Sequence, residues 1–174
     1  MSRVECVDLL ISRPIPTIKN GKPMSEKQTR SCEVIDLSHD GRGVARIDGK
    51  ACFIQGALPN ETIEFRYNNR KRNYDEGRVT DIIQVSDDRV EPDCKHFSRC
   101  GGCSLQHLDH GKQVEFKQQQ LLASLSRGGI EAETLLPALS APHWGYRRRA
   151  RLAVQRAKDG KFLIGFRNAG SRRI

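Results

Sequence analysis

The fold is decided by the stretch Gly43-Val44-Ala45-Arg46-Ile47-Asp48-Gly49-Lys50-Ala51-Cys52-Phe53-Ile54, which holds two short strand-forming runs joined by Asp-Gly. An Asp-Gly pair between two such runs favours a two-residue hairpin turn. Further strand-forming segments lie on both sides of this hairpin, at residues 33–37, 62–67 and 77–83. Five short strands that share one buried face favour a small closed barrel of the OB type, which we expect over residues 29–88.

Three cysteines follow the barrel segment at close spacing. Cys94, Cys100 and Cys103 form the pattern C-x5-C-G-G-C. Thiolates at this density favour zinc or an iron-sulfur cluster over hard, oxygen-seeking ions. The two glycines would let the backbone turn sharply and direct N–H groups at the sulfur atoms. The sequence therefore predicts a metal or cluster site in a loop over residues 89–108.

The rest of the chain has the pattern of one helix and one hairpin. Asp109 can cap a helix over residues 109–128 that ends at a Gly-Gly pair and carries an apolar stripe of Val114, Leu121, Leu122 and Leu125. Beyond it, two alternating runs at 151–155 and 162–166 flank a polar turn and predict a β-hairpin. The expected fold is mainly β with one helix (α+β). No strand is followed by a glycine-rich cofactor turn, so we expect no Rossmann-like domain here.

Composition narrows the class of protein. The 174 residues are 37% hydrophobic and include six cysteines, and no apolar run is long enough for a secretory leader or a membrane span. Cysteines without a leader indicate a reducing compartment, so we expect a cytoplasmic protein without a membrane partner. We expect a monomer, although the sequence does not determine the oligomeric state. Residues 1–28 are polar and contain proline and glycine, which predicts a flexible leader.

All of the net charge of +9 lies in the last part of the chain. From Gly145 to Ile174 there are eight Arg and two Lys against the single Asp159, while the preceding residues balance at twenty cations against twenty carboxylates. Such a strip predicts phosphate contacts whose affinity falls as salt rises. Interleaved aromatic residues offer surfaces for base stacking. The predicted RNA contacts here are Arg147, Arg148, Arg149 and Arg151, and a solvated basic hairpin face is the alternative.

A second basic cluster falls in the predicted barrel, around one hairpin loop. Its members are basic or tyrosine side chains, namely Arg66, Tyr67, Arg70, Lys71, Arg72 and Tyr74. Loops carry function in barrel folds, and this loop could hold an RNA backbone and stack a base. An ordinary charged hairpin tip is an equal alternative. Arg42 and Arg46 are weaker candidates for RNA contact.

The segment from Cys94 to His107 (CKHFSRCGGCSLQH) resembles the cluster-binding segment of the RNA uracil-5 methyltransferases, in particular those that act on 23S ribosomal RNA and begin with a TRAM domain. Residues 40–46 and 53–59 upstream, and 144–151 and 165–167 downstream, are similar to the same family, so the resemblance covers about residues 30–174. It implies that the barrel is a TRAM domain, a module associated with RNA binding.

The resemblance also implies an activity for the full-length protein. Enzymes of this family transfer a methyl group from S-adenosylmethionine to C5 of a uracil, after a cysteine thiolate has added to C6 and before a carboxylate removes the C5 proton. We expect the nucleophile, the base and the cofactor site beyond Ile174, and therefore no catalytic or S-adenosylmethionine-binding residue in this chain. It would be an inactive N-terminal fragment in which 129–174 begin a truncated central β domain.

Alternatives remain for both the function and the metal. A stand-alone RNA-binding or iron-sulfur module without catalysis, or a fragment of a transfer RNA enzyme, would also carry these features. The resemblance implies a 4Fe-4S cluster on Cys94, Cys100 and Cys103 whose fourth ligand lies outside this chain, unless a small thiol or one of Cys6, Cys32 and Cys52 substitutes. The competing assignment is zinc held by the three cysteines and either His96 or His107.

Overall fold

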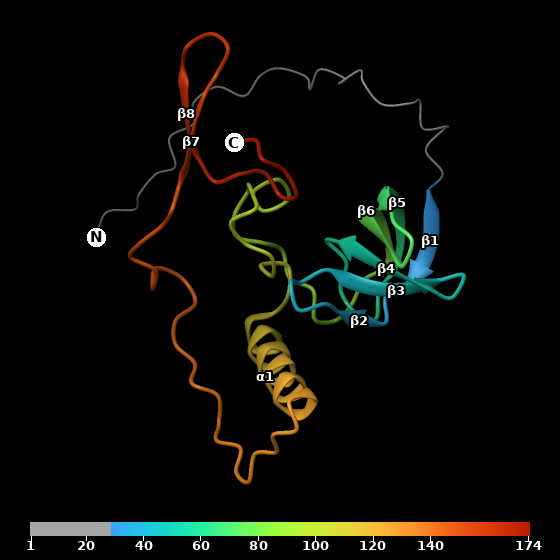
Figure 1. Cartoon of the computed structure of the whole chain (residues 1–174). Coiled ribbons are helices and arrows are strands. Elements are labelled where there is room, and N and C mark those ends of the chain that lie inside the picture. The colour runs from blue at the N-terminus through green and yellow to red at the C-terminus, as the bar shows by residue number, and fades with distance from the viewer. Residues whose placement is uncertain (1–28) are drawn as a thin grey trace.

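The computed structural model describes residues 29–174 and shows a β-barrel, a loop that carries the cysteines, one helix and a separate hairpin (Figure 1). The leader predicted for residues 1–28 lies outside the described residues. The barrel sheet has the strand order β1 (Arg30–Glu33), β5 (Thr62–Arg70), β6 (Tyr74–Gln84), β4 (Lys50–Gln55), β3 (Gly43–Ile47) and β2 (Asp36–Leu37). The predicted mainly β fold with one helix is confirmed, and the described residues contain no Rossmann-like domain.

The barrel closes because its first strand bends and changes partners. Strand β1 pairs antiparallel with β5, and β2 pairs antiparallel with β3. Between them the Val34 N–H donates to the Glu61 carbonyl at 2.9 Å, and the Ile35 N–H donates to the Val44 carbonyl at 2.8 Å. The single strand predicted at 33–37 is therefore wrong: it is two short strands on opposite sides of the bend. Strands β4 and β6 form the one parallel pair of the barrel.

The central hairpin forms as its sequence predicts. Asp48 and Gly49 have φ of 51° and 79°, the positive values that a two-residue turn of this kind requires at both positions. Alternate residues then face inward, so Cys52 and Ile54 are fully buried while Phe53 between them lies on the outer face. The barrel core contains only small and medium apolar side chains and one large ring: Val34, Ala45, Cys52, Ile54, Ala57, Ile63 and Phe65.

A buried ion pair attaches the barrel to the segment that follows it. The Glu61 side chain is fully buried, and Arg89 donates to it from Nε to Oε1 at 2.5 Å and from a terminal nitrogen to Oε2 at 2.9 Å. Arg89 also donates to the Gly56 carbonyl at 2.7 Å, and the Leu58 N–H donates to Glu61 Oε2 at 2.8 Å. The backbone of Arg89 pairs with Leu108, which packs in a second small core. Both ends of the cysteine loop are thus fixed at this point.

The helix and the second hairpin lie outside the barrel. Helix α1 (His110–Arg127) begins after Asp109, whose side chain accepts from the Lys112 N–H at 3.2 Å, and it ends at Gly128 as predicted. None of its residues is fully buried. Strands β7 (Ala153–Arg156) and β8 (Phe162–Gly165) form the predicted antiparallel hairpin, which projects away from the barrel (Figure 1). Within 29–174, no helix is both long and apolar enough to cross a membrane.

Replacing Glu61 should test how far the barrel depends on this ion pair. In the Glu61→Ala variant the Arg89 guanidinium and the Leu58 N–H lose their acceptor, so we expect the free energy of unfolding to fall by about 3 kcal/mol. The measurement is urea denaturation followed by circular dichroism. Glu115→Ala is the matched control, because Glu115 is half exposed and pairs only with Lys112, and its loss should cost under about 1 kcal/mol. Equal losses in the two variants would contradict the role given to Glu61.

Candidate functional site

The cysteine loop is held by hydrogen bonds at its tip as well as at its ends. Inside the loop, the His96 carbonyl accepts from the Cys100 N–H at 2.8 Å. The last residues of the chain run beside it: the Gly101 N–H donates to the Arg167 carbonyl, and the Ala169 N–H donates to the Arg99 carbonyl, both at 2.8 Å. A side chain at Gly101 would place its Cβ 2.9 Å from the Arg167 carbonyl, so this glycine is needed for close approach rather than for a positive φ.

The three cysteines of the loop carry free thiols. Cys94 and Cys100 are partly exposed, and Cys103 is exposed. The Gly102 N–H donates to Cys100 Sγ at 3.3 Å, which is the N–H contact to sulfur that the sequence predicts for a glycine here. Thiols with an N–H donor of this kind have the chemistry of a soft-metal or cluster site.

The geometry does not gather the thiols into a ligand set. In the part of the chain that the structure describes, no group of three or more His, Cys, Asp and Glu side chains could hold a metal ion. Neither His96 nor His107 completes such a group with the cysteines. The donor chemistry therefore fits a thiolate-bound metal, but the arrangement does not, and the assignment of Cys94, Cys100 and Cys103 as ligands stays a prediction.

His107 is a buried imidazole at the base of the loop. Only 2% of its surface is exposed, neither ring nitrogen has a hydrogen-bond partner, and its ring lies 5.2 Å from that of Phe97. Burial lowers the pKa of His107 from its ordinary value of 6.5 to about 4, and the charge of Arg89 adds to this effect while Glu61 opposes it. The imidazole is therefore neutral at physiological pH.

The basic cluster of the barrel lies mostly on strands. Strand β5 continues to Arg70 and β6 begins at Tyr74, so the predicted hairpin forms with longer strands and a shorter turn than expected. Each of two cations covers a ring: the Arg70 guanidinium lies 4.9 Å from the Tyr67 ring centre, and Lys71 Nζ lies 4.9 Å from that of Tyr74. Of the remaining members, Arg66 and Arg72 are exposed.

The basic residues of the tail form a separate surface. Arg147, Arg148, Arg149 and Arg151 are all exposed in the irregular segment that leads to β7. The Arg147 guanidinium lies 5.6 Å from the Tyr146 ring centre, which gives one cation and one ring at the same place. The structure does not bring this surface together with the barrel cluster, since the two lie apart in the molecule (Figure 1).

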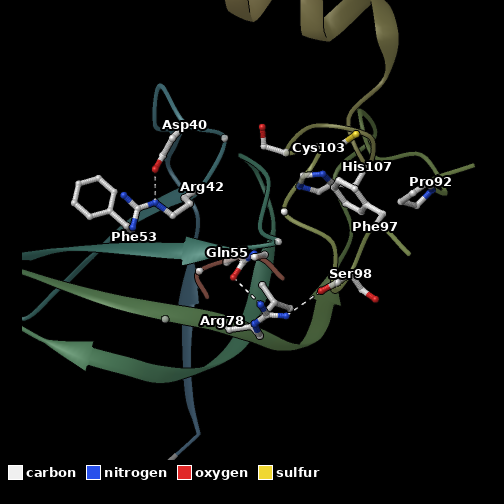
Figure 2. Close-up of a pocket in the computed structure, with 18 of the residues that line it drawn as sticks. Asp40, Arg42, Phe53, Gln55, Arg78, Pro92, Phe97, Ser98, Cys103 and His107 are labelled. Carbon is white, nitrogen blue, oxygen red and sulfur yellow. Dashed lines mark hydrogen bonds and ion pairs between the residues drawn. The ribbon is translucent and has the colours of Figure 1, made fainter. Parts of the chain in front are cut away.

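A cavity of about 960 Å³ separates the barrel from the cysteine loop. Figure 2 shows its two walls: Arg42, Phe53, Gln55 and Arg78 on the barrel side, and Phe97, Ser98 and His107 on the loop side. The sequence did not predict this site, because its walls come from segments that are far apart in the chain. The one local feature of the sequence that indicates this site is the alternation in β4, which turns Phe53 and Gln55 away from the core.

The shifted pKa of His107 makes stability depend on pH. Because the unfolded chain binds a proton near pH 6.5 and the folded chain only near pH 4, the free energy of unfolding should fall as pH drops between these values, by on the order of 3 kcal/mol. We expect His107→Gln to lose this part of the pH dependence in urea denaturation. His39→Gln, which removes an exposed histidine, should keep it. Identical pH profiles for wild type and His107→Gln would contradict the buried neutral imidazole.

Comparison with known proteins agrees with this architecture. The model of the TRAM domain family matches residues 26–80, which cover most of the barrel. The chain is 46% identical over 155 residues to the 23S rRNA (uracil(1939)-C(5))-methyltransferase RlmD of Legionella pneumophila (strain Corby). This match covers 88% of this chain and 35% of the relative. The enzymes of the same name from Nitrosococcus oceani and Xylella fastidiosa are 47% and 50% identical over 154 and 140 residues, or 86% and 78% of this chain.

These matches cover most of this chain but only part of each relative. The chain spans about one third of the length of the curated relatives it matches, at 35%, 34% and 32% of the three enzymes. Within that third the identity is high and includes both the barrel and most of the residues that follow it. The chain therefore contains a TRAM domain and, over most of its length, is similar to about one third of these 23S rRNA uracil-C5 methyltransferases.

Proposed function

We propose that this chain is the RNA-recognition portion of an S-adenosylmethionine-dependent methyltransferase that modifies C5 of a uracil in 23S ribosomal RNA. The observation that carries the proposal is the 46% identity over 88% of the chain to an enzyme named for that reaction. The relatives are named for 23S rRNA, so ribosomal RNA is favoured over transfer RNA. The proposal includes a cytoplasmic location, where ribosomes are found and where unpaired cysteines stay reduced.

The chemistry of the reaction explains why such an enzyme needs a dedicated RNA-binding portion. A uracil can react at C5 only after it has left its stack, and the unstacked RNA must be held during the reaction. In this proposal the chain holds the RNA, while methyl transfer uses a nucleophile, a base and a cofactor site outside it. The chain alone would therefore bind RNA without methylating it.

We assign the main phosphate contacts to the arginines of the tail. Arg147, Arg148, Arg149 and Arg151 are exposed, and they belong to the segment that holds all of the net positive charge. The barrel cluster is a weaker phosphate site, because part of its charge is neutralised: Arg70 Nε lies 3.5 Å from an oxygen of Asp75, whose other oxygen lies 2.7 Å from Lys50 Nζ. The barrel cluster would instead contribute its tyrosines and the exposed Arg66 and Arg72.

We further propose that Cys94, Cys100 and Cys103 bind a 4Fe-4S cluster whose fourth ligand comes from outside the chain. Their spacing, their free thiols and the Gly102 N–H directed at Cys100 support the proposal. Because the thiols are not gathered in the present geometry, cluster binding would have to draw the loop together. The loop is exposed over much of its length and has room to do so.

The salt dependence of RNA binding tests the phosphate contacts. Replacing Arg147, Arg148, Arg149 and Arg151 together by Gln should weaken binding to single-stranded ribosomal RNA fragments and lower the slope of log affinity against log salt by about two. We expect two rather than four because side chains of neighbouring residues point in different directions, so the four arginines cannot all reach one RNA strand. Fluorescence anisotropy at several salt concentrations gives the slope.

A double variant on the helix, Lys117→Gln with Arg127→Gln, removes two exposed positive charges away from both basic surfaces and should leave the slope unchanged. If the fourfold variant remained folded by circular dichroism and kept the wild-type slope, the phosphate contacts would have to lie on the barrel cluster instead.

Purification without oxygen tests the cluster. The wild-type chain, reconstituted with iron, sulfide and a small thiol as the fourth ligand, should be brown and contain both elements, whereas replacement of Cys94, Cys100 and Cys103 by Ser should abolish the colour and the iron. Cys32→Ser is the control, since Cys32 is a half-buried barrel residue with a pKa raised by burial to about 11. A colourless wild-type protein that contains zinc would replace the cluster by the zinc site.

A further inference from the structure

The cavity between the barrel and the cysteine loop is not used by the RNA contacts proposed above. Its volume of about 960 Å³ lies at the upper end of the range of ligand pockets, which is roughly 300–1,000 Å³. Besides cysteines and the neutral His107, its ionisable residues are four cations and three carboxylates. The cavity is therefore large enough for a small planar ligand and carries almost no net charge.

The arginines of the barrel wall already have protein partners. Arg42 is held by two carboxylates, with Nε 2.8 Å from an oxygen of Asp40 and a terminal nitrogen 3.2 Å from Glu76. Arg78 donates to the Gln55 side-chain oxygen at 2.7 Å and to the Ser98 carbonyl at 3.1 Å, which links the two walls (Figure 2). The charge of Arg42 is neutralised and the donors of Arg78 are partly used, so both have less to offer a phosphate but remain rigid planar surfaces.

Arg42 and Phe53 together form a stacked platform on the barrel wall. The Arg42 guanidinium lies 5.0 Å from the centre of the Phe53 ring, and the Phe53 ring meets Tyr74 edge to face at 5.6 Å. The Arg42 side chain keeps 30% of its surface exposed. Aromatic rings and arginine planes are the surfaces on which proteins stack the unstacked bases of single-stranded RNA.

Side-chain amides stand beside the platform. Asn68 and Asn69, at the end of β5, both line the cavity and are exposed. Asn69 uses one N–H for Glu76, at 3.3 Å, and keeps its oxygen free for a ligand. A carboxamide has both donors and an acceptor, so it can match the edge of a nucleobase, where donors and acceptors lie side by side.

We propose that this cavity binds one unstacked nucleobase of the RNA, which stacks on the Arg42–Phe53 pair and is hydrogen-bonded by Asn68 and Asn69. A base is planar, uncharged and polar at its edge, which matches a cavity with a stacked platform, balanced charge and exposed amides. The inference rests on the proposed function as an RNA-binding chain and adds a base-binding site between the barrel and the cysteine loop.

The test uses the full chain and a fluorescein-labelled oligouridine, with affinity measured by fluorescence anisotropy at several salt concentrations. Phe53→Ala should weaken binding about tenfold, as expected for the loss of one stacked base. Arg42→Lys, which keeps the charge and loses the plane, should also weaken binding, by several-fold. In both variants the salt slope should be that of the wild type, because no phosphate contact is removed.

Three comparisons separate base stacking from a general effect on the fold. Phe53→Tyr keeps the ring and should bind like the wild type, and Arg127→Lys changes an exposed helix arginine outside the cavity and should have no effect. On an oligonucleotide of the same length made of abasic nucleotides, wild type and Phe53→Ala should bind equally. If Phe53→Ala proves unfolded, Phe53→Leu keeps the apolar bulk and removes the ring, and the same losses are expected.

The possible failures are distinguishable. Wild-type affinity in Phe53→Ala and Arg42→Lys, with a reduced salt slope in the fourfold arginine variant, would overturn the base-binding site and leave the proposed function standing. A salt slope lowered by about one in Arg42→Gln, which removes the charge, would also overturn it, because Arg42 would then contact phosphate. No binding of RNA by the wild-type chain would overturn both this inference and the proposed role of the chain.

Discussion

The carboxylate of Glu61 is the point on which the arrangement of this molecule depends. A fully buried carboxylate is costly unless it is paired and hydrogen-bonded, and here Arg89 and the Leu58 N–H supply the donors. Because Arg89 also reaches the Gly56 carbonyl and pairs through its backbone with Leu108, one ion pair fixes a barrel turn and both ends of the cysteine loop. The neutral state of His107 fits this place, since a further positive charge beside Arg89 would be unfavourable.

The cysteine loop is accordingly fixed to the rest of the chain at its base and at its tip, but not between these two points. At the tip the ties are backbone hydrogen bonds to Arg167 and Ala169, which lie in a segment far along the chain. The loop therefore forms one wall of the cavity, and two of its cysteines, Cys94 and Cys103, are among the residues that line it. Any change that draws the thiols together would move Phe97 and Ser98 as well, and so would alter the wall that faces Arg42.

Features set by neighbouring residues could be predicted from the sequence, and features set by distant partners could not. The turn at Asp48-Gly49 and the cap at Asp109 depend on a few adjacent residues, and both form as expected. The bend after β1 depends on a change of partner from β5 to β3, for which residues 33–37 carry no signal. Likewise β5 continues through polar residues such as Asn69, because pairing with β6 through irregular register outweighs their low strand propensity.

The same contrast holds for the candidate site, of which the sequence predicts some features and not others. The cysteine spacing indicated soft-metal chemistry, yet the positions of the thiols depend on the approach of residues 167–169 to the loop tip. The basic residues were visible as charge, but the sequence does not show that Asp40 and Glu76 neutralise Arg42 and fix it against Phe53. A cavity whose walls come from six parts of the chain has no signature in any one of them.

The hairpin of β7 and β8 has a consequence for how the chain behaves in solution. Two isolated strands are marginally stable, and these two expose Val154, Phe162 and Ile164, each with more than 60% of its surface in solvent, along with two unpaired edges. Repulsion between the neighbouring arginines of two molecules opposes the joining of such edges. Concentrated salt screens that repulsion and strengthens apolar association, so the purified chain will self-associate most readily in the high-salt buffers that strip nucleic acid from it.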